Sequence, residues 1–167
     1  MSDSVPVGWE SRRLGDIGIF KTSSVDKKTR LNEQVVSLVN YMDVYRNNII
    51  SPDYQFQKVT ANKNQTESSN LTKGDILFTP SSETPDDIGH SAVVVDELER
   101  TLHSYHLVRF RLNNQELLDL HFRGYVFRAN YIMKQFYLGA TGSTRFTLSI
   151  GDFSKIRVIF PSPLPEQ

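Results

Sequence analysis

The apolar residues of this chain come in short stretches separated by polar loops, and several of these stretches alternate between apolar and polar side chains. In residues 103–112, Arg109 and Arg111 fall on one side of an extended chain and large apolar residues fall on the other. A period of two is typical of a half-buried β-strand. Further strands are predicted at residues 16–21, 35–39, 54–59, 76–79, 92–95 and 155–160.

A helical pattern occurs only late in the chain. Residues 115–122 are predicted to form one helix with an asparagine cap. Beyond it, apolar residues at helical spacing form a stripe that we expect to pack in the core: Tyr125, Ala129, Ile132, Met133 and Phe136. Gly139 is expected to end this element, and Ser149 with Asp152 is typical of a capping pair that opens a short turn. We therefore predict the α+β class, with a twisted, largely antiparallel sheet and a few helices.

Two polar segments are predicted to be loops. Residues 62–70 contain no apolar side chain, which indicates a solvated segment. Residues 81–90 follow Pro80, which ends the preceding strand because proline cannot donate to a ladder. Loops held by a rigid sheet are suited to binding, so both segments are candidates for a functional surface.

Chain length and the absence of cysteine limit what the protein can be. A chain of 167 residues suffices for one domain with its own core. Because there is no cysteine, disulfides, thiolate zinc sites and cysteine nucleophiles are excluded. No apolar run approaches the roughly 20 residues that a membrane span needs, and the first residues do not resemble a signal peptide. We therefore expect a cytoplasmic protein without a membrane partner.

The motifs of several enzyme classes are missing from the sequence. The two glycine clusters, at residues 15–18 and 139–142, lack the spacing of a phosphate-binding loop, and there is no Walker motif. The polar-Pro-Pro-aromatic motif of a DNA methyltransferase is also missing. His103 and His106 lie in one predicted strand at a spacing that would put them on opposite faces. We therefore expect no metal site and no cofactor.

Two weaker enzyme hypotheses stay open. Ser81 or Ser82 could join His90 and an aspartate in a hydrolase triad, although no nucleophile elbow surrounds either serine. Asp86, Asp87 and His90 could serve a metal-dependent nuclease, although the Glu-x-Lys that such a site needs does not follow. The residues favour a protein that binds over one that catalyses.

The charge balance gives opposing indications about nucleic acid. Nineteen Lys and Arg balance nineteen Asp and Glu, whereas a small nucleic-acid module is usually basic. The charge of one segment differs from the net charge of the whole chain. Residues 21–30, which we call the lysine loop, contain one acid, Asp26, and four cations: Lys21, Lys27, Lys28 and Arg30.

Four blocks of sequence follow one another along the chain. The first is Trp-Glu-Ser-Arg-Arg-Leu-Gly-Asp-Ile at residues 9–17, and the second is Asn-Tyr-Met-Asp-Val at residues 40–44. The third is Leu-Thr-Lys-Gly-Asp-Ile-Leu-Phe-Thr at residues 71–79. The fourth runs from Gly-Ser-Thr-Arg-Phe at residues 142–146 to Pro-Leu-Pro-Glu-Gln at residues 163–167. Each block alone is a common turn or strand, but in this order they resemble the specificity subunits of type I restriction-modification systems.

This resemblance implies a recognition role without catalysis. Such a subunit carries two target-recognition domains separated by long helices, and each domain reads one half of a split double-stranded DNA site. Methyltransferase subunits and motor-nuclease subunits carry the chemistry. By this resemblance residues 1–160 are one target-recognition domain, and residues 161–167 begin a spacer helix at which this chain breaks off. The rival hypotheses are a protein-interaction domain of this fold without DNA binding, and the metal-dependent nuclease.

Loops and two nearby side chains are the candidates for contacting DNA. Cations and hydroxyls suit phosphates, whereas amides and carboxylates suit base edges in the major groove. Residues 81–87 are favoured for base readout, and Arg145 for clamping a phosphate, but ordinary solvated loops have the same composition. The predicted DNA-binding residues are Lys21, Thr22, Ser24, Lys27, Lys28, Arg30, Tyr41, Arg46, Lys63, Asn64, Ser81, Ser82, Glu83, Thr84, Thr141, Ser143, Thr144 and Arg145.

Overall fold

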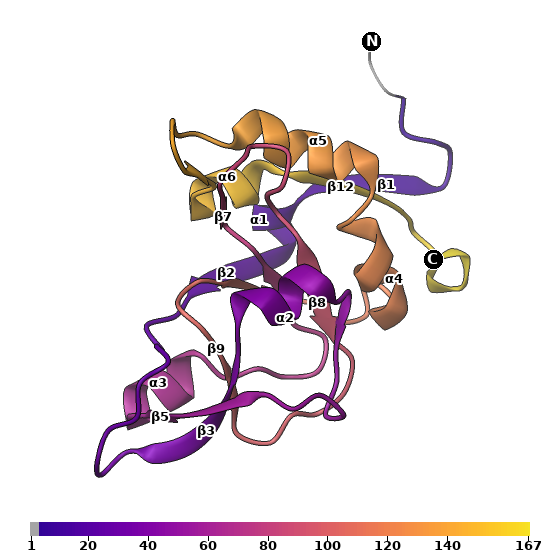
Figure 1. Ribbon diagram of the computed structural model, residues 1–167. Coiled ribbons are helices and arrows are strands. Elements are labelled where there is room, and N and C mark those ends of the chain that lie inside the picture. Colours follow the sequence, from indigo (N-terminus) through magenta and orange to yellow (C-terminus); the bar gives the residue numbers. More distant parts are fainter. Residues whose placement is uncertain (1–3) are drawn as a thin grey trace.

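The computed structural model describes residues 4–167 and confirms the α+β class. The strands form four sheets (Figure 1). The largest sheet has the order β2 (Gly18–Thr22), β10 (Val108–Leu112), β6 (Ile76–Phe78), β8 (Ser91–Val94) and β4 (Ile49–Ile50). A second sheet has the order β5 (Gln57–Ala61), β3 (Gln34–Val39) and β9 (Thr101–His103). Two-stranded ribbons pair β1 (Trp9–Arg13) with β12 (Arg157–Pro161), and β7 (Ser81–Ser82) with β11 (Phe146–Thr147).

Strand pairing in the described residues is antiparallel except for β3 with β9 and β4 with β8. The helices are short: α1 (Leu14–Ile17), α2 (Tyr41–Arg46), α3 (Lys63–Ser68), α4 (Leu120–Val126), α5 (Asn130–Gly139), α6 (Ile150–Lys155) and the 3-10 turn η1 (Leu164–Glu166). In Figure 1, α5 and α6 lie at one end of the molecule, and the three-stranded sheet with α3 lies at the other. No helix within residues 4–167 combines the length and the apolar character needed to cross a membrane.

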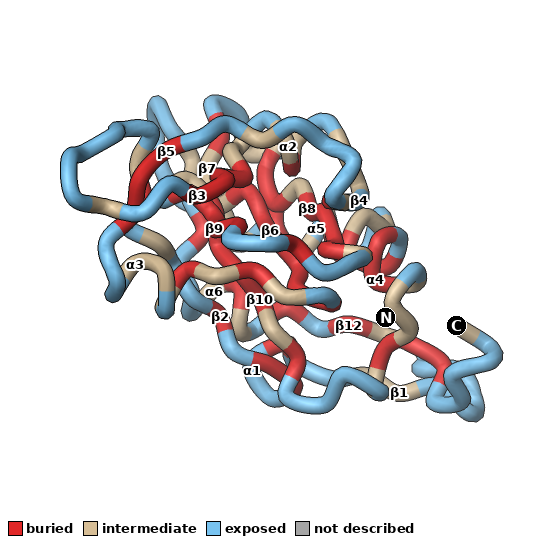
Figure 2. Tube along the Cα trace, turned by 90° about the horizontal axis from the view of Figure 1, so that it is seen from below, coloured by how far each residue is buried: buried red, intermediate tan, exposed pale blue. Residues whose placement is uncertain are grey.

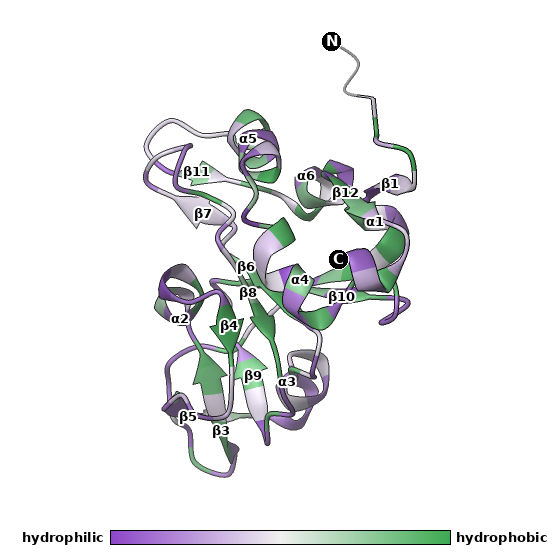
Figure 3. Ribbon diagram, turned by 90° about the vertical axis from the view of Figure 1, so that its right-hand side faces the viewer, coloured by the Kyte–Doolittle hydropathy of each residue, from purple (hydrophilic) through white to green (hydrophobic). Residues whose placement is uncertain are grey.

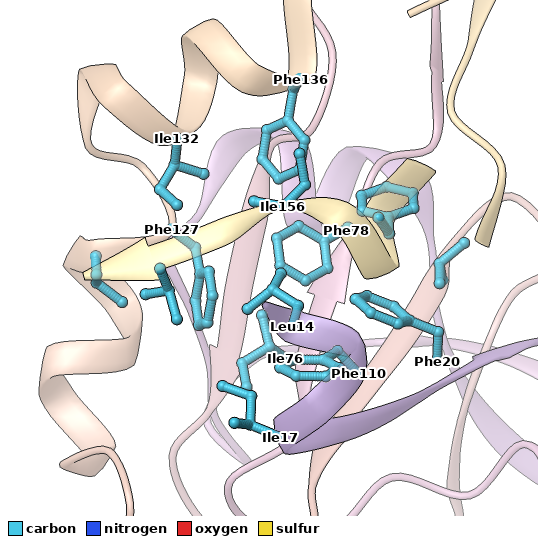
Figure 4. Packing of buried hydrophobic residues seen from close by; sticks show 14 of the residues in the cluster. Leu14, Ile17, Phe20, Ile76, Phe78, Phe110, Phe127, Ile132, Phe136 and Ile156 are labelled. Atoms are coloured by element: carbon cyan, nitrogen blue, oxygen red, sulfur yellow. The ribbon is translucent and has the colours of Figure 1, made fainter. Parts of the chain in front are cut away.

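The main core lies between the five-stranded sheet, the late helices and the β1–β12 ribbon (Figure 4). Phe78 is at its centre, with ring centroids 5.4 Å from Phe127, 5.7 Å from Phe136 and 5.3 Å from Phe153. The pairs with Phe127 and Phe136 are edge-to-face, a geometry that adds to the stabilisation that burial itself supplies. Figure 2 shows the buried segments running through the middle of the fold. Two smaller apolar clusters lie on either side of the three-stranded sheet and against α2.

The predicted apolar stripe after residue 124 is partly wrong. Ile132 and Phe136 are buried, but Tyr125 is 70% exposed. The chain does not stay helical through this region, because α4 ends at Val126 and α5 begins at Asn130. Residues on two separate helices do not share one face, so the predicted apolar stripe exists only for the residues within α5.

The segment predicted as a solvated loop at residues 62–70 contains α3. Asn62 accepts a hydrogen bond from the Gln65 amide at 2.9 Å, and the Gln65 side chain accepts from the Asn62 amide at 3.1 Å. This reciprocal cap satisfies the first free amides of a helix. No residue of α3 is buried, so the expected exposure to solvent is correct although the conformation is not.

Other element boundaries also differ from the predictions. Residues 103–112 form the end of β9 and all of β10, separated by the turn at residues 104–107. The helix predicted at residues 115–122 begins only at Leu120, because Asp119 caps it by accepting from the amides of His121 and Phe122. Capping pairs and turns of this kind override the apolar pattern on which the boundaries were predicted.

Further differences lie in the first half of the chain. Residues 16–17 belong to α1, residues 41–46 form α2, and the strand predicted at residues 54–59 begins at Gln57. The short strand β7 lies within the loop predicted at residues 81–90. The capping pair Ser149–Asp152 and the end of α5 at Gly139 are as predicted.

The Lys-Gly-Asp turn before β6 holds the sheet together. Asp75 is fully buried and accepts from Arg111 Nε at 2.7 Å, from Arg111 Nη2 at 2.8 Å and from the Thr72 amide at 2.8 Å. Gly74 has a φ of +94°, and its carbonyl accepts from Arg123 Nη1 at 2.9 Å. Residues with a Cβ rarely adopt this positive φ, so the turn favours glycine. The turn therefore sets the direction of β6 and of the loop that follows it.

Candidate nucleic-acid interface

A shallow hollow lies between α2 and the β7–β11 ribbon, which occupy the same side of the molecule in Figure 3. Its volume is about 420 Å³. We call it the Arg145 hollow; its lining residues are Tyr41, Met42, Tyr45, Ser82, Glu83, Thr84, Asp87 and Arg145. Five of these eight residues are among those predicted to contact DNA: Tyr41, Ser82, Glu83, Thr84 and Arg145.

The ribbon side of the hollow is held by backbone pairing and by two side chains. Ser82 pairs with Phe146, and Ser81 pairs with Thr147. The Tyr41 hydroxyl donates to the Ser81 carbonyl at 2.9 Å, and Arg145 Nη2 donates to Ser81 Oγ at 3.1 Å. Ser81 thereby ties α2 and β11 to the same strand.

The turn of the ribbon requires a glycine. Gly142 has a φ of +144°, and a Cβ built on it would lie 2.0 Å from the Arg145 carbonyl oxygen. Only glycine adopts this conformation without strain. The predicted contact residues Thr141, Ser143 and Thr144 flank this glycine and are exposed.

The α2 side of the hollow is built by a capped helix. The Asp43 carboxylate accepts from the Asn40 amide at 2.7 Å and so helps to start α2. Tyr41 and Tyr45 are four residues apart and share one face, with ring centroids 6.0 Å apart. The Tyr45 hydroxyl donates to Asp87 Oδ2 at 3.0 Å.

Both tyrosines are held in the neutral form. Burial, and next the negative charge of Asp87, raise the pKa of Tyr41. The hydrogen bond to Asp87 raises the pKa of Tyr45. The two phenols therefore act as hydrogen-bond donors at neutral pH, and they fix the geometry of the hollow.

The lysine loop forms a second hollow, lined by Ser24, Asp26, Lys27, Lys28 and Tyr105. Val25 is fully buried and anchors the loop, and its carbonyl accepts from the Tyr105 amide at 3.0 Å. Arg30 Nη2 lies 3.0 Å from Asp26 Oδ2, and the hydrogen bond from Arg30 lowers the pKa of Asp26. Arg30 therefore has a carboxylate partner within the loop, whereas Lys27 and Lys28 are exposed cations.

The turn at residues 104–107 contributes Tyr105 to the hollow of the lysine loop. Burial lowers the pKa of His106, and the positive charges of Arg145 and Lys27 lower it further. Both cations are thus close enough to act on one imidazole. The ring of Tyr105 lies against it, with a centroid distance of 3.8 Å. Tyr105 and His106 of this turn therefore lie near both the lysine loop and Arg145.

Helix α3 lies against the lysine loop. Gln65 Nε2 donates to the Ser24 carbonyl at 3.1 Å, which places the neighbouring Lys63 and Asn64 beside the loop. Lys63 also lies 3.9 Å from Glu67, in an exposed pair that contributes little to stability. These two predicted residues lie at the margin of the surface.

The remaining predicted residues are not part of either hollow. Arg46 is exposed at the end of α2 and does not line the Arg145 hollow. Lys21 and Thr22 are the last two residues of β2, where the lysine loop begins. Sequence reasoning did not assign Tyr45, Tyr105 or His106 to the surface, although Tyr45 follows Tyr41 at helical spacing.

The structure brings together His90 and Asp87 of the two enzyme hypotheses, but the hydroxyls of Ser81 and Ser82 have other partners. His90 Nε2 lies 2.7 Å from Asp87 Oδ1, and Asp87 also accepts from Tyr45. The hydroxyl of Ser81 accepts from Arg145, and that of Ser82 accepts from the Thr84 amide at 3.3 Å. Within residues 4–167, no group of three or more His, Asp or Glu side chains is placed to hold a metal ion.

Comparisons with solved structures show the same fold at low sequence identity. A type I restriction-modification S subunit from M. genitalium superposes with a TM-score of 0.57 at 13% identity over 97% of this chain. The HsdS subunit from Thermoanaerobacter tengcongensis gives 0.60 at 12% identity over 96% of this chain. A structure from work on complex assembly and conformational transition of the type I R-M system gives 0.60 at 11% identity, also over 96%.

This chain spans about a third of the length of each of those proteins: 36% of the M. genitalium and R-M system chains, and 35% of the Thermoanaerobacter tengcongensis chain. No curated protein matches the sequence. A family model, described as the type I restriction modification DNA specificity domain, matches residues 6–167. The chain therefore belongs to the family of type I restriction-modification DNA specificity domains, a family of DNA target recognition.

Proposed function

We propose that this domain reads one half of a bipartite double-stranded DNA target and leaves catalysis to separate subunits. The observation that carries the proposal is a pair of hollows, one formed by the lysine loop with Tyr105 and the other lying between α2 and the β7–β11 ribbon. They present the exposed cations Lys27, Lys28 and Arg145 together with hydroxyls, carboxylates and aromatic rings.

The two hollows suit the two tasks of a DNA reader. Flexible lysines at the rim suit phosphates, which fix the position of a protein on the duplex without reporting sequence. Side chains held by a sheet and a helix suit base edges, where a small displacement removes a hydrogen bond. The lysine loop is thus assigned to phosphates and the Arg145 hollow to bases.

The neutral net charge does not itself support the proposal. Four of the nineteen Lys and Arg residues donate to carbonyls or to a carboxylate within the fold, which leaves fewer cations for DNA: Arg109, Arg111, Arg123 and Arg128. The proposal depends on where the free cations lie.

In the assembly that we propose, this domain forms residues 1–160, and residues 161–167 lead into a spacer helix. A second domain of the same kind would read the other half of the target. Methyltransferase subunits and motor-nuclease subunits would be the protein partners. Alone, the domain should bind weakly, because the complete reader gains from two linked half-sites.

The test is selection from a randomised duplex library at low salt, repeated at higher salt. We expect enrichment of one short motif of roughly three to five base pairs, with recovery falling as salt rises. A Lys27→Gln, Lys28→Gln double variant should reduce the slope of log affinity against log salt by about 2, at roughly 0.9 for each phosphate contact.

The matched control is Lys134→Gln, which removes a positive charge from a hollow lined by Val5, Arg157 and residues of α5. This variant should keep the wild-type slope. Recovery of no motif at any salt, together with equal slopes for all variants, would refute DNA reading and support a protein-interaction domain. Metal-dependent cleavage of the library would support the nuclease hypothesis instead.

A further inference from the structure

Two opposite charges line the Arg145 hollow without forming an ion pair. In the β7–β11 ribbon Ser82 pairs with Phe146, so the next positions outward are Glu83 and Arg145. Both side chains line the hollow and both residues are exposed. The ion pairs found within residues 4–167 involve neither of them.

The other carboxylate and the two tyrosine hydroxyls of the hollow already have partners inside the protein. Asp87 accepts from Tyr45 and contacts His90, and the Tyr41 hydroxyl donates to the Ser81 carbonyl. Arg145 uses only Nη2, which donates to Ser81 Oγ at 3.1 Å. A guanidinium has five N–H donors, so most of those of Arg145 are available to a ligand. The same holds for the carboxylate oxygens of Glu83, for which no protein donor is found among the described residues.

A guanidinium with two free N–H donors, lying beside a free carboxylate, matches one kind of base pair better than the others. In the major groove guanine offers two acceptors, O6 and N7, and its partner cytosine offers the N4 amino donor. An arginine binds both guanine acceptors at once, and a carboxylate accepts from the cytosine amino group. Adenine offers one acceptor next to a donor, so one of these two N–H donors would meet a donor on that base.

We propose that the Arg145 hollow reads a G·C base pair, with Arg145 facing guanine and Glu83 facing cytosine. This inference rests on the proposed function and adds the identity of one position in the target. It changes the role of Arg145 from a phosphate clamp to a base reader. The hydrogen bond to Ser81 Oγ orients the guanidinium of Arg145. Ser81 belongs to β7, and Glu83 follows directly after this strand.

The test compares base preferences of variants in the same library selection. Arg145→Lys keeps the positive charge but loses the bidentate fork. We expect it to keep the salt dependence of the wild type and to reduce the preference for G·C at one position by about tenfold to a hundredfold. Glu83→Ala should relax the same position, since it removes the acceptor that faces the cytosine amino group.

The matched control is Lys27→Gln in the lysine loop, which should weaken binding to all sequences alike and leave the motif unchanged. Circular dichroism of each variant checks the fold; both substituted side chains of the hollow are exposed and outside the core.

Three results would overturn the inference. A wild-type motif without any G·C position would do so while leaving the proposed function intact. An Arg145→Lys variant that binds all sequences more weakly by the same factor, or that keeps the wild-type base preference, would indicate that Arg145 contacts a phosphate instead of a base. Failure of the wild-type domain to select any motif would overturn the proposed function as well, so the two failures are distinguishable.

Discussion

Removing the buried carboxylate of Asp75 should markedly lower the denaturant concentration at which this domain unfolds. Asp75 is 0% exposed, and two of its three hydrogen bonds come from the Arg111 guanidinium. Breaking one partner of a buried ion pair typically costs about 3–5 kcal/mol, because the other charge stays behind unpaired. The Arg111 side chain is 32% exposed, so water can partly replace the lost carboxylate. We therefore expect Asp75→Asn to lower the free energy of unfolding by about 3 kcal/mol, at the low end of that range.

Urea denaturation followed by far-UV circular dichroism measures this change. With a slope of about 2 kcal/mol per molar urea, the midpoint should fall by roughly 1.5 M. Arg111→Met and the double variant with Asp75→Asn complete a double-mutant cycle. Because each single variant already removes the ion pair, the double variant should be less destabilised than the sum by about 1–3 kcal/mol.

A loss below about 1 kcal/mol for Asp75→Asn, with additive effects in the cycle, would refute this reasoning. The Gly-Asp turn would then be maintained by backbone conformation alone. Either result tests the stability of the fold and not DNA binding, because Asp75 does not line the Arg145 hollow.

Three further predictions concern single sites. Burial lowers the pKa of His103 from 6.5 to about 4, so the unfolded chain binds a proton that the folded chain does not, and stability should fall by about 3 kcal/mol as pH drops from 6.5 to 4. Unfolding curves for His103→Gln should show a smaller loss over that pH range, and an unchanged loss would contradict this assignment. Gly142→Ala should destabilise the β7–β11 ribbon by about 1–3 kcal/mol and broaden its amide resonances, because the new Cβ would meet the Arg145 carbonyl. Ser149→Ala should cost about 1 kcal/mol in thermal unfolding through loss of the α6 cap, and a neutral effect would show that Asp152 alone suffices.

Predictions from the sequence succeed where the pattern that carries them is local. The alternation around Phe110 identifies β10, the Ser149–Asp152 pair identifies the start of α6, and the β-branched run at residues 35–39 identifies β3. They fail where a short polar signal decides the conformation and no hydrophobic periodicity marks the element. The Asn62–Gln65 cap makes a helix of a segment without apolar residues.

The candidate site itself depends on contacts between distant parts of the chain. Tyr41 reaches Ser81 across 40 residues of sequence, and Arg145 reaches it across 64. No local pattern indicates that these three residues meet, or that Glu83 and Arg145 line the same hollow without pairing. By itself the sequence determines the α+β class, the order of its motifs and the residue types available for DNA. Only the tertiary structure decides which of them share a surface, because strand pairing and helix packing bring together residues that are far apart along the chain.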